Sequence, residues 1–413
     1  MSATSAALAK RAVRIYTWLL VILFALALLV VGIQTMRGLG YPANTFLFDP
    51  DYRFSDFAVF ASRFRSTASA KEFFEKFGDT FNYGAPAFVA FSFLSKAMAS
   101  PWYLMLGVVA VTAATAALWL ARSLQGSGFF WAIPATLLLN YPLLYTMDRG
   151  NFEGMIWPVM LLSILLFARK KYYWAAGCFG LIAATKFFPA ILFLLLVRKQ
   201  RWKELIFGIL TFAGSTYGSL CWIGPNPLAA QQHISNAMAS FKEWYTLYWD
   251  YKEIGFDHSL FAVWKQILRQ WFGNTDDVPD VLTKTVNAYA ALTGGGFLLL
   301  YWFRLRKLPV LNCVMACLVA MVTFPYVSYD YTLSHLYIAW GLFLIFLARG
   351  AACLTLRQML LFLVPFAVIF TPQSYLLWED FGFGGQVKAV VLLCLFLCAL
   401  RFPLPLPQLD EGY

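Results

Sequence analysis

A few charged side chains, far apart in the sequence, carry the groups that chemistry on a charged or hydroxylated substrate requires. Asp56 begins a short amphipathic segment, where a carboxylate can take the proton of an acceptor hydroxyl. Arg149 and Lys186 carry the positive charge that neutralises a phosphate. Asp330 lies between two tyrosines, whose rings can stack on a sugar or hold a lipid chain. The sequence thus holds a candidate base and candidate phosphate ligands, and the elements between them must bring them together.

Those elements are predicted to cross a membrane. The chain has 413 residues, of which 61% are hydrophobic and 13% are charged. Soluble domains have about 45–50% apolar and about 25% charged residues, so a soluble enzyme is excluded. The apolar runs are continuous and long enough to span the hydrocarbon core, and they do not alternate as strands of a barrel do. We expect one all-α polytopic membrane domain over residues 1–413, with about 11–13 transmembrane helices.

The net charge of +11 comes largely from short basic clusters beside apolar runs. This pattern fixes orientation by the positive-inside rule and implies no nucleic-acid partner. It predicts cytoplasmic N- and C-termini and a retained first span at Tyr16–Met36, not a signal peptide. The clusters lie at residues 10–14, 169–171, 198–203 and 304–307.

If the N-terminus is cytoplasmic and successive spans cross the membrane in alternate directions, several loops lie on the extracytoplasmic side. The first of them, 37–83, contains two amphipathic pieces, Ser55–Arg65 and Lys71–Phe77, that suit the membrane interface. Further external loops are expected at 148–153, 223–279, 327–332 and 372–386, between spans near 204–222, 280–302, 308–326, 333–348, 353–371 and 387–402. The number of crossings within 84–147 stays open, with plausible breaks at Ser100-Pro101 and at Asn140-Tyr141-Pro142.

Lys186 lies between two basic clusters that are both expected in the cytoplasm. The apolar pieces 172–185 and 187–197 are each too short to span at about 1.5 Å per residue. They predict two short helices that break near Thr185–Pro189, with Lys186 at half depth. A lysine there is costly unless it faces a cavity or an anion, so it is a functional candidate.

Each candidate also has a structural interpretation that the sequence leaves open. Asp56 can satisfy backbone amides at a helix N-terminus, and Arg149 can form a loop salt bridge with Asp148. Lys186 can snorkel toward the interface, and His335 can donate to a neighbouring carbonyl.

The long loop 223–279 carries two of the three histidines and many aromatic residues. We expect His233 and His258 to be solvated, and the aromatics of 241–256 either line a site or form an interfacial belt. No two histidines have metal-ligand spacing, so we expect no metal site and no cofactor.

Five motifs, read together, are similar to a known family. In order and spacing they resemble the superfamily C (GT-C) glycosyltransferases, in particular the bacterial polyprenol-phosphate-mannose-dependent mannosyltransferases. Some members have His where Tyr331 stands and Gly-Gln where Gly150-Asn151 stands. The motifs are Ser55-Asp56-Phe57, Phe81-Asn82-Tyr83-Gly84-Ala85-Pro86, Asn140-Tyr141-Pro142 followed by Asp148-Arg149-Gly150-Asn151, Lys186-Phe187-Phe188-Pro189 and Ser328-Tyr329-Asp330-Tyr331.

The resemblance implies a GT-C-type bundle that catalyses an inverting transfer of mannose or another hexose or pentose. The donor would be a polyprenyl-phosphate-linked sugar and the acceptor a lipid or glycan, on the extracytoplasmic face of a bacterial inner membrane. Asp56 would be the catalytic base, and Arg149 and Lys186 would bind the donor phosphate. The sugar or acceptor pocket would be lined by Asn151, Glu153, Asp330, Tyr331 and His335.

Two other functions remain open at this point. A transporter or flippase of a lipid-linked sugar also uses broken helices with a charge at half depth, but it commonly shows internal repeats, and the two halves of this sequence show no convincing similarity. A ligase that transfers a whole lipid-linked glycan would share the base and the cations, and the sequence separates it poorly from a glycosyltransferase.

Overall fold

The structure is a computed structural model that describes residues 3–40, 53–78, 81–247, 255–272, 277–350, 353–372, 376–378 and 381–410. The predicted loops 37–83, 223–279 and 372–386 therefore lie partly outside the described residues. Helices dominate the described part, and two-residue strands β1 (Leu377–Trp378) and β2 (Phe381–Gly382) form one antiparallel pair.

The prediction of an all-α polytopic membrane protein is confirmed. Among the described residues, five helical segments are long and apolar enough to cross a membrane: Ser5–Met36, Pro101–Ser123, Trp202–Ile223, Asp330–Arg349 and Gly384–Arg401. Shorter apolar helices accompany them at Ala85–Ala97, Glu153–Ala168, Phe188–Arg198, Val310–Thr323 and Leu356–Phe370.

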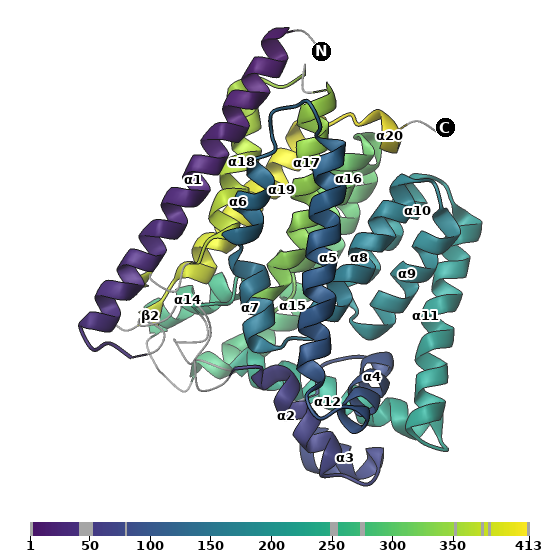
Figure 1. The fold of residues 1–413 in the computed structure, drawn as a ribbon. Helices are drawn as coiled ribbons and strands as arrows, with labels where there is room; N and C mark the ends of the chain where they lie inside the picture. Colours follow the sequence, from purple (N-terminus) through teal and green to yellow (C-terminus); the bar gives the residue numbers. More distant parts are fainter. Residues whose placement is uncertain are drawn as a thin grey trace.

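The N-terminal helix α1 (Ala3–Met36) lies along one side of the bundle, against α6 (Ala132–Leu138) and α18 (Leu356–Phe370) (Figure 1). It begins earlier than the predicted span at Tyr16, because the helix continues through the basic residues 10–14. Its 34 residues correspond to about 51 Å, so it is longer than a hydrocarbon core of about 30 Å.

The segment that the sequence left open, 84–147, forms α4 (Ala85–Ala97), α5 (Pro101–Ser123), α6 and the start of α7 (Tyr141–Arg149). Both predicted breaks are confirmed. At the second break the Asn140 side chain accepts a hydrogen bond from the Leu143 amide at 2.9 Å. With 7 residues in α6 and 9 in α7, neither helix alone spans the membrane.

The predicted broken hairpin is also present. It follows α8 (Glu153–Ala168) and consists of α9 (Tyr172–Thr185), the 3-10 helix η3 (Phe188–Leu192) and α10 (Phe193–Arg198). The break falls at Lys186, which is extended, and Pro189 cannot donate a backbone hydrogen bond. The next helix, α11 (Trp202–Ile223), packs closely on α9, because a Cβ on Gly180 would lie 2.3 Å from the Gly208 carbonyl oxygen.

The core of the second half is α16 (Val310–Thr323), whose residues are all buried. It packs against α17 (Leu336–Gly350) and α19 (Gly384–Arg401). The remaining elements are α12 (Pro227–Leu247), α14 (Leu260–Phe272), α15 (Asp277–Phe303), η4 (Leu305–Lys307), η5 (Asp330–His335) and α20 (Pro407–Asp410).

The two ends of the bundle differ. The predicted amphipathic pieces form α2 (Ser55–Arg65) and α3 (Ala70–Phe77), which lie with α4 and α12 at the end opposite both termini (Figure 1). At the end with the termini, Arg198 donates to the Leu308 carbonyl at 2.9 Å and Lys199 to the Asp410 carbonyl at 3.0 Å. Two of the basic clusters and the C-terminal segment thus meet at one end, and α2 with Asp56 lies at the other.

Candidate functional site

Two left-handed turns fix the start of α2. Phe54 has φ 58° and its amide donates to the Asp148 carbonyl at 2.7 Å. Gly150 has φ 62°, and a Cβ there would lie 3.0 Å from the Cα of Phe54. Glycine is therefore favoured at 150 by both its conformation and the close approach of Phe54. The contact holds the first turn of α2, with Asp56, beside the end of α7.

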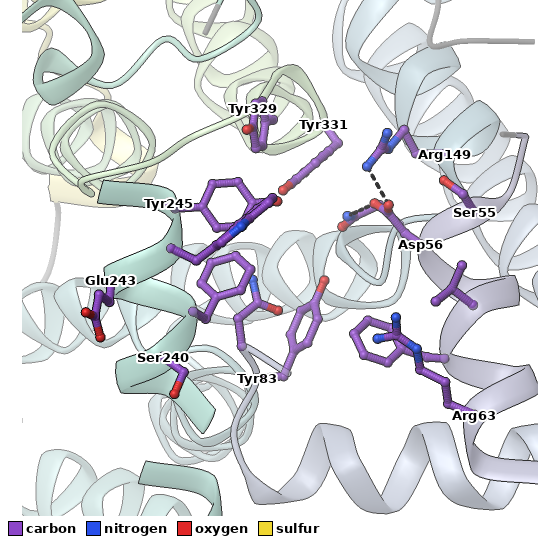
Figure 2. Close-up of a pocket in the computed structure, with 16 residues that line it drawn as sticks. Ser55, Asp56, Arg63, Tyr83, Arg149, Ser240, Glu243, Tyr245, Tyr329 and Tyr331 are labelled. Carbon is purple, nitrogen blue, oxygen red and sulfur yellow. Dashed lines mark hydrogen bonds and ion pairs between the residues drawn. The ribbon is translucent and has the colours of Figure 1, made fainter. Parts of the chain in front are cut away.

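Asp56 is held by two side chains of the α7–α8 turn. Its Oδ1 accepts a hydrogen bond from Arg149 Nη2 and its Oδ2 one from Asn151 Nδ2, both at 2.6 Å (Figure 2). The alternative of an N-terminal cap is wrong, because the cap position is Phe54 and the carboxylate bonds to side chains. Arg149 pairs with Asp56, and Asp148 has Arg53 as an ion-pair partner at 3.8 Å.

The Asp56 carboxylate faces a cavity of about 600 Å³. On the same wall, Val59, Phe60 and Arg63 follow Asp56 along one face of α2. Across the cavity from Asp56 lie Tyr83, Tyr245, Tyr329 and Tyr331, which we call the tyrosine wall, with Ser240 and Glu243 of α12 (Figure 2). Phe241 and Trp244 of α12 also line the cavity. An open cavity that joins two carboxylates, two arginines and several tyrosines is suited to a hydroxylated ligand that carries a charged group.

Tyr83 of the tyrosine wall lies in the connection between α3 and α4. Burial raises its pKa well above the usual value, and the carboxylates of Asp56 and Glu153 raise it further. A phenol is protonated at neutral pH, so Tyr83 can donate a hydrogen bond at the cavity wall.

The backbone at Tyr83 is docked onto the broken hairpin. The Gly84 amide donates to the Thr185 carbonyl at 2.9 Å, which satisfies one carbonyl at the end of α9. A Cβ on Gly84 would lie 2.0 Å from the Ala184 carbonyl oxygen, so no other residue fits without a shift. This contact couples the position of Tyr83 to the break at Lys186.

Glu153, Lys186 and His335 form a cluster behind the tyrosine wall. Glu153 is 1% exposed; its Oε1 pairs with Lys186 Nζ, and its Oε2 lies 2.8 Å from His335 Nε2. Lys186 Nζ lies 5.8 Å from the ring centroid of Tyr83 and 5.7 Å from that of Tyr331. The snorkelling interpretation is therefore wrong, and Lys186 supports the two tyrosines from behind instead of lining the cavity.

Asp330 is placed differently from the other predicted site residues. It is 3% exposed, pairs with Lys388 of α19 at 2.8 Å and lies 3.5 Å from His258 Nδ1. The expectation that His258 is solvated is wrong, because the loop 255–259 packs under η5 and leaves this histidine fully buried. His233 is half-buried and stacks on Phe74.

The structure therefore gathers Asp56, Arg149, Asn151 and Tyr331 at the cavity, with Glu153, Lys186 and His335 next to it. Of the aromatics in 241–256, Phe241, Trp244 and Tyr245 line the cavity, which agrees with the site interpretation of that segment.

Sequence reasoning missed Arg63 and Lys388. The spacing of Arg63 from Asp56, two helical turns on one face, was a signal for the first. An isolated lysine in the apolar run 387–402 was a signal for the second. Among the described residues, no group of three or more His, Cys, Asp or Glu side chains is arranged to hold a metal ion.

Residues 83–328 match the sequence model of glycosyltransferase family 87. The chain belongs to this family. Glycosyltransferase family 87 is a GT-C-type family of membrane glycosyltransferases, so the resemblance seen in the sequence is confirmed at this level. The match includes Arg149, Asn151, Glu153 and Lys186, and Asp56 precedes it. No curated protein and no solved structure matches the chain.

Proposed function

We propose that this family 87 glycosyltransferase moves a sugar from a polyprenyl-phosphate donor to a hydroxyl of a lipid or glycan acceptor, with inversion at the anomeric carbon. The observation that carries the proposal is the Asp56 carboxylate, which Arg149 and Asn151 hold at the wall of an open cavity. The sugar is mannose or another hexose or pentose.

Asp56 is the proposed catalytic base. Each carboxylate oxygen has two acceptor positions, and the bonds to Arg149 and Asn151 occupy one on each. A remaining position accepts the proton of the acceptor hydroxyl as its oxygen bonds to the anomeric carbon. The bond from that carbon to the phosphate oxygen breaks, and its electron pair leaves with the polyprenyl phosphate. One displacement of this kind inverts the configuration.

Arg149 has two proposed roles. It orients the Asp56 carboxylate, and its guanidinium, which lines the cavity, offers positive charge to the donor phosphate. Asn151 orients Asp56 from the other side, and Tyr83 and Tyr331 are proposed to contact the sugar. The resemblance implied direct phosphate contact for Lys186; its pairing with Glu153 supports a positioning role instead, shared with His335.

A groove on the lateral face of the bundle supports a lipid-linked donor. It has a volume of about 500 Å³, begins at Pro86 and continues along α4 to Phe93, with α9 and α11 on its other side. Gly214 and Gly218 leave open space on α11. Pro86 of the groove follows Tyr83 of the cavity by three residues. A prenyl chain bound in the groove would therefore keep its phosphate close to the cavity.

We propose cytoplasmic termini and an extracytoplasmic site, in a bacterial inner membrane. The support is that both termini lie at one end of the bundle and α2 lies at the other (Figure 1). At the end with the termini, basic side chains donate hydrogen bonds to backbone carbonyls: Arg198 to Leu308, Lys199 to Asp410 and Arg304 to Leu400. The positive-inside rule assigns that end to the cytoplasm. The aromatic, amphipathic α2 and α3 then lie at the outer interface.

The test is turnover by purified protein in lipid, with a radiolabelled polyprenyl-phosphate mannose and a membrane glycolipid extract as acceptor. Asp56→Asn should lower turnover about 10²- to 10⁴-fold, since it removes the base and keeps the shape of the cavity. Glu75→Gln, an exposed change on α3, is the matched control and should leave turnover unchanged. Full turnover by a folded Asp56→Asn variant would contradict the assignment. Transfer of a complete glycan instead of one sugar would favour a ligase.

A further inference from the structure

We propose that Arg63 of α2 binds the phosphate of the lipid-linked donor, on the same wall of the cavity as the base and two helical turns from it. The inference rests on the proposed function, because it assigns the residue that holds the leaving group of that reaction. It starts from the position of Arg63 along the helix.

Asp56 and Arg63 lie on one face of α2, two turns apart, and both line the cavity. Seven residues correspond to a Cα separation of about 10.5 Å along the helix axis. In a single displacement the base contacts the hydroxyl at about 3 Å and the hydroxyl approaches the anomeric carbon at about 3 Å, so the departing oxygen lies about 7 Å from the base. Side chains on a helix point toward its N-terminus, so the Arg63 side chain extends toward Asp56. Its guanidinium can therefore contact a phosphate oxygen that lies about 7 Å from the Asp56 carboxylate.

Aromatic rings hold the Arg63 guanidinium in place. Its Cζ lies 5.2 Å from the ring centroid of Phe77 in α3 and 6.0 Å from that of Phe60. Phe60 is itself packed against Phe81 and Phe91. A guanidinium that contacts rings through its face keeps its N–H groups in the plane, where they can bind two phosphate oxygens. Figure 2 shows Arg63 beside the cavity, below Asp56.

The position of Arg149 limits what it can do alone for a phosphate. Arg149 pairs with Asp56, and Lys186 pairs with Glu153 behind the tyrosine wall. A phosphate placed only at Arg149 would lie next to the Asp56 carboxylate, and the two negative charges would repel each other. Arg63 offers positive charge on the same wall and farther from Asp56.

The neighbouring arginine has a different role. Arg65 donates from Nε to the Ser95 carbonyl at 2.7 Å and from Nη2 to the Met98 and Ala99 carbonyls at 2.6 and 2.7 Å. It therefore caps the end of α4 and ties it to α2, so the two arginines of the last turn divide the structural and the ligand-binding roles between them.

The experiment measures binding of a short-chain polyprenyl monophosphate, and of the matching uncharged polyprenol, to the full chain in lipid nanodiscs. Arg63→Gln should weaken binding of the phosphate about 10- to 100-fold and leave binding of the polyprenol unchanged. Arg63→Lys, which keeps the charge and loses the planar fork, should show a smaller loss. Lys76→Gln on α3 removes an exposed positive charge that pairs with Glu72, and it should bind like the wild type.

The outcomes separate this proposal from the proposed function. If the wild type prefers the phosphate over the polyprenol and Arg63→Gln keeps that preference, the role of Arg63 is refuted and the donor class stands. If the wild type shows no preference, the polyprenyl-phosphate donor is refuted and the role of Arg63 with it. An equal loss in Lys76→Gln would refute a specific contact and show a general effect of surface charge.

Discussion

The buried cluster behind the tyrosine wall gives the sharpest test of how the site is held. Glu153→Gln keeps the size of the side chain but removes its charge. The variant loses the ion pair with Lys186, and its hydrogen bond to His335 no longer involves a charged carboxylate. Lys186 and His335 then remain at a position where the Glu153 side chain is 1% exposed.

The structure sets the expected size of the effect. Breaking a buried ion pair by removing one partner costs about 3–5 kcal/mol, because it leaves an uncompensated charge. The Lys186 side chain is 17% exposed, so water reaches part of it, and we expect the free energy of unfolding to fall by about 3 kcal/mol. Removing both charges in Glu153→Gln/Lys186→Met should restore about 2 kcal/mol of that loss, since no unpaired charge remains.

The assay is a double-mutant cycle of unfolding in mixed detergent and SDS micelles, together with polyprenyl monophosphate binding. If Lys186 only positions Tyr83 and Tyr331, the double variant should bind the phosphate nearly as the wild type does. Additive losses of stability, or a tenfold loss of affinity in Lys186→Met that persists in the double variant, would refute the reasoning. The second result would return Lys186 to the phosphate-binding role that the resemblance implied.

Two further predictions concern packing and orientation. Gly84→Ala should lower both the melting temperature and turnover, because its Cβ would collide with the Ala184 carbonyl oxygen. The control Gly107→Ala meets open space and should have little effect on either. Equal effects of the two changes would contradict the docking of Gly84. In a cysteine-free background, a membrane-impermeant thiol reagent added from outside should label Glu243→Cys at the cavity and leave Lys203→Cys at the opposite end unlabelled. The reverse pattern would overturn the proposed orientation.

The sequence predicts local breaks and short amphipathic helices well, because their causes are local. Amphipathic spacing within the segments themselves predicts α2 and α3. The lone Lys186 and the nearby Pro189 predict the break at the end of α9. The helix boundaries within 84–147 depend on proline in the same way, and only the number of crossings stayed open there.

Side-chain partners were less predictable, because they come from distant parts of the chain. Nothing near Asp330 in the sequence points to Lys388 as its partner, and nothing near His258 shows that this histidine is buried against η5. The sequence predicts a break at Lys186, yet the neutralisation of this lysine by Glu153 depends on how α8 packs on α9. An isolated charge within apolar sequence can be recognised from the sequence, whereas the identity of its partner requires the fold.

The pairing of Asp56 with the α7–α8 turn also has a consequence for biosynthesis. Asp56 and its two partners are separated by 93 and 95 residues, so α2 is made well before the side chains that hold its carboxylate. At about 5–20 residues per second, the ribosome needs about 5–20 s to reach Asn151 after Asp56. During that interval the proposed base lacks the contacts that orient it, and the left-handed turn at Phe54 has no Gly150 to pack against. Assembly of the active centre is thus delayed until the third apolar region after α2 has been synthesised, and a nascent chain that stalls earlier carries an unassembled site.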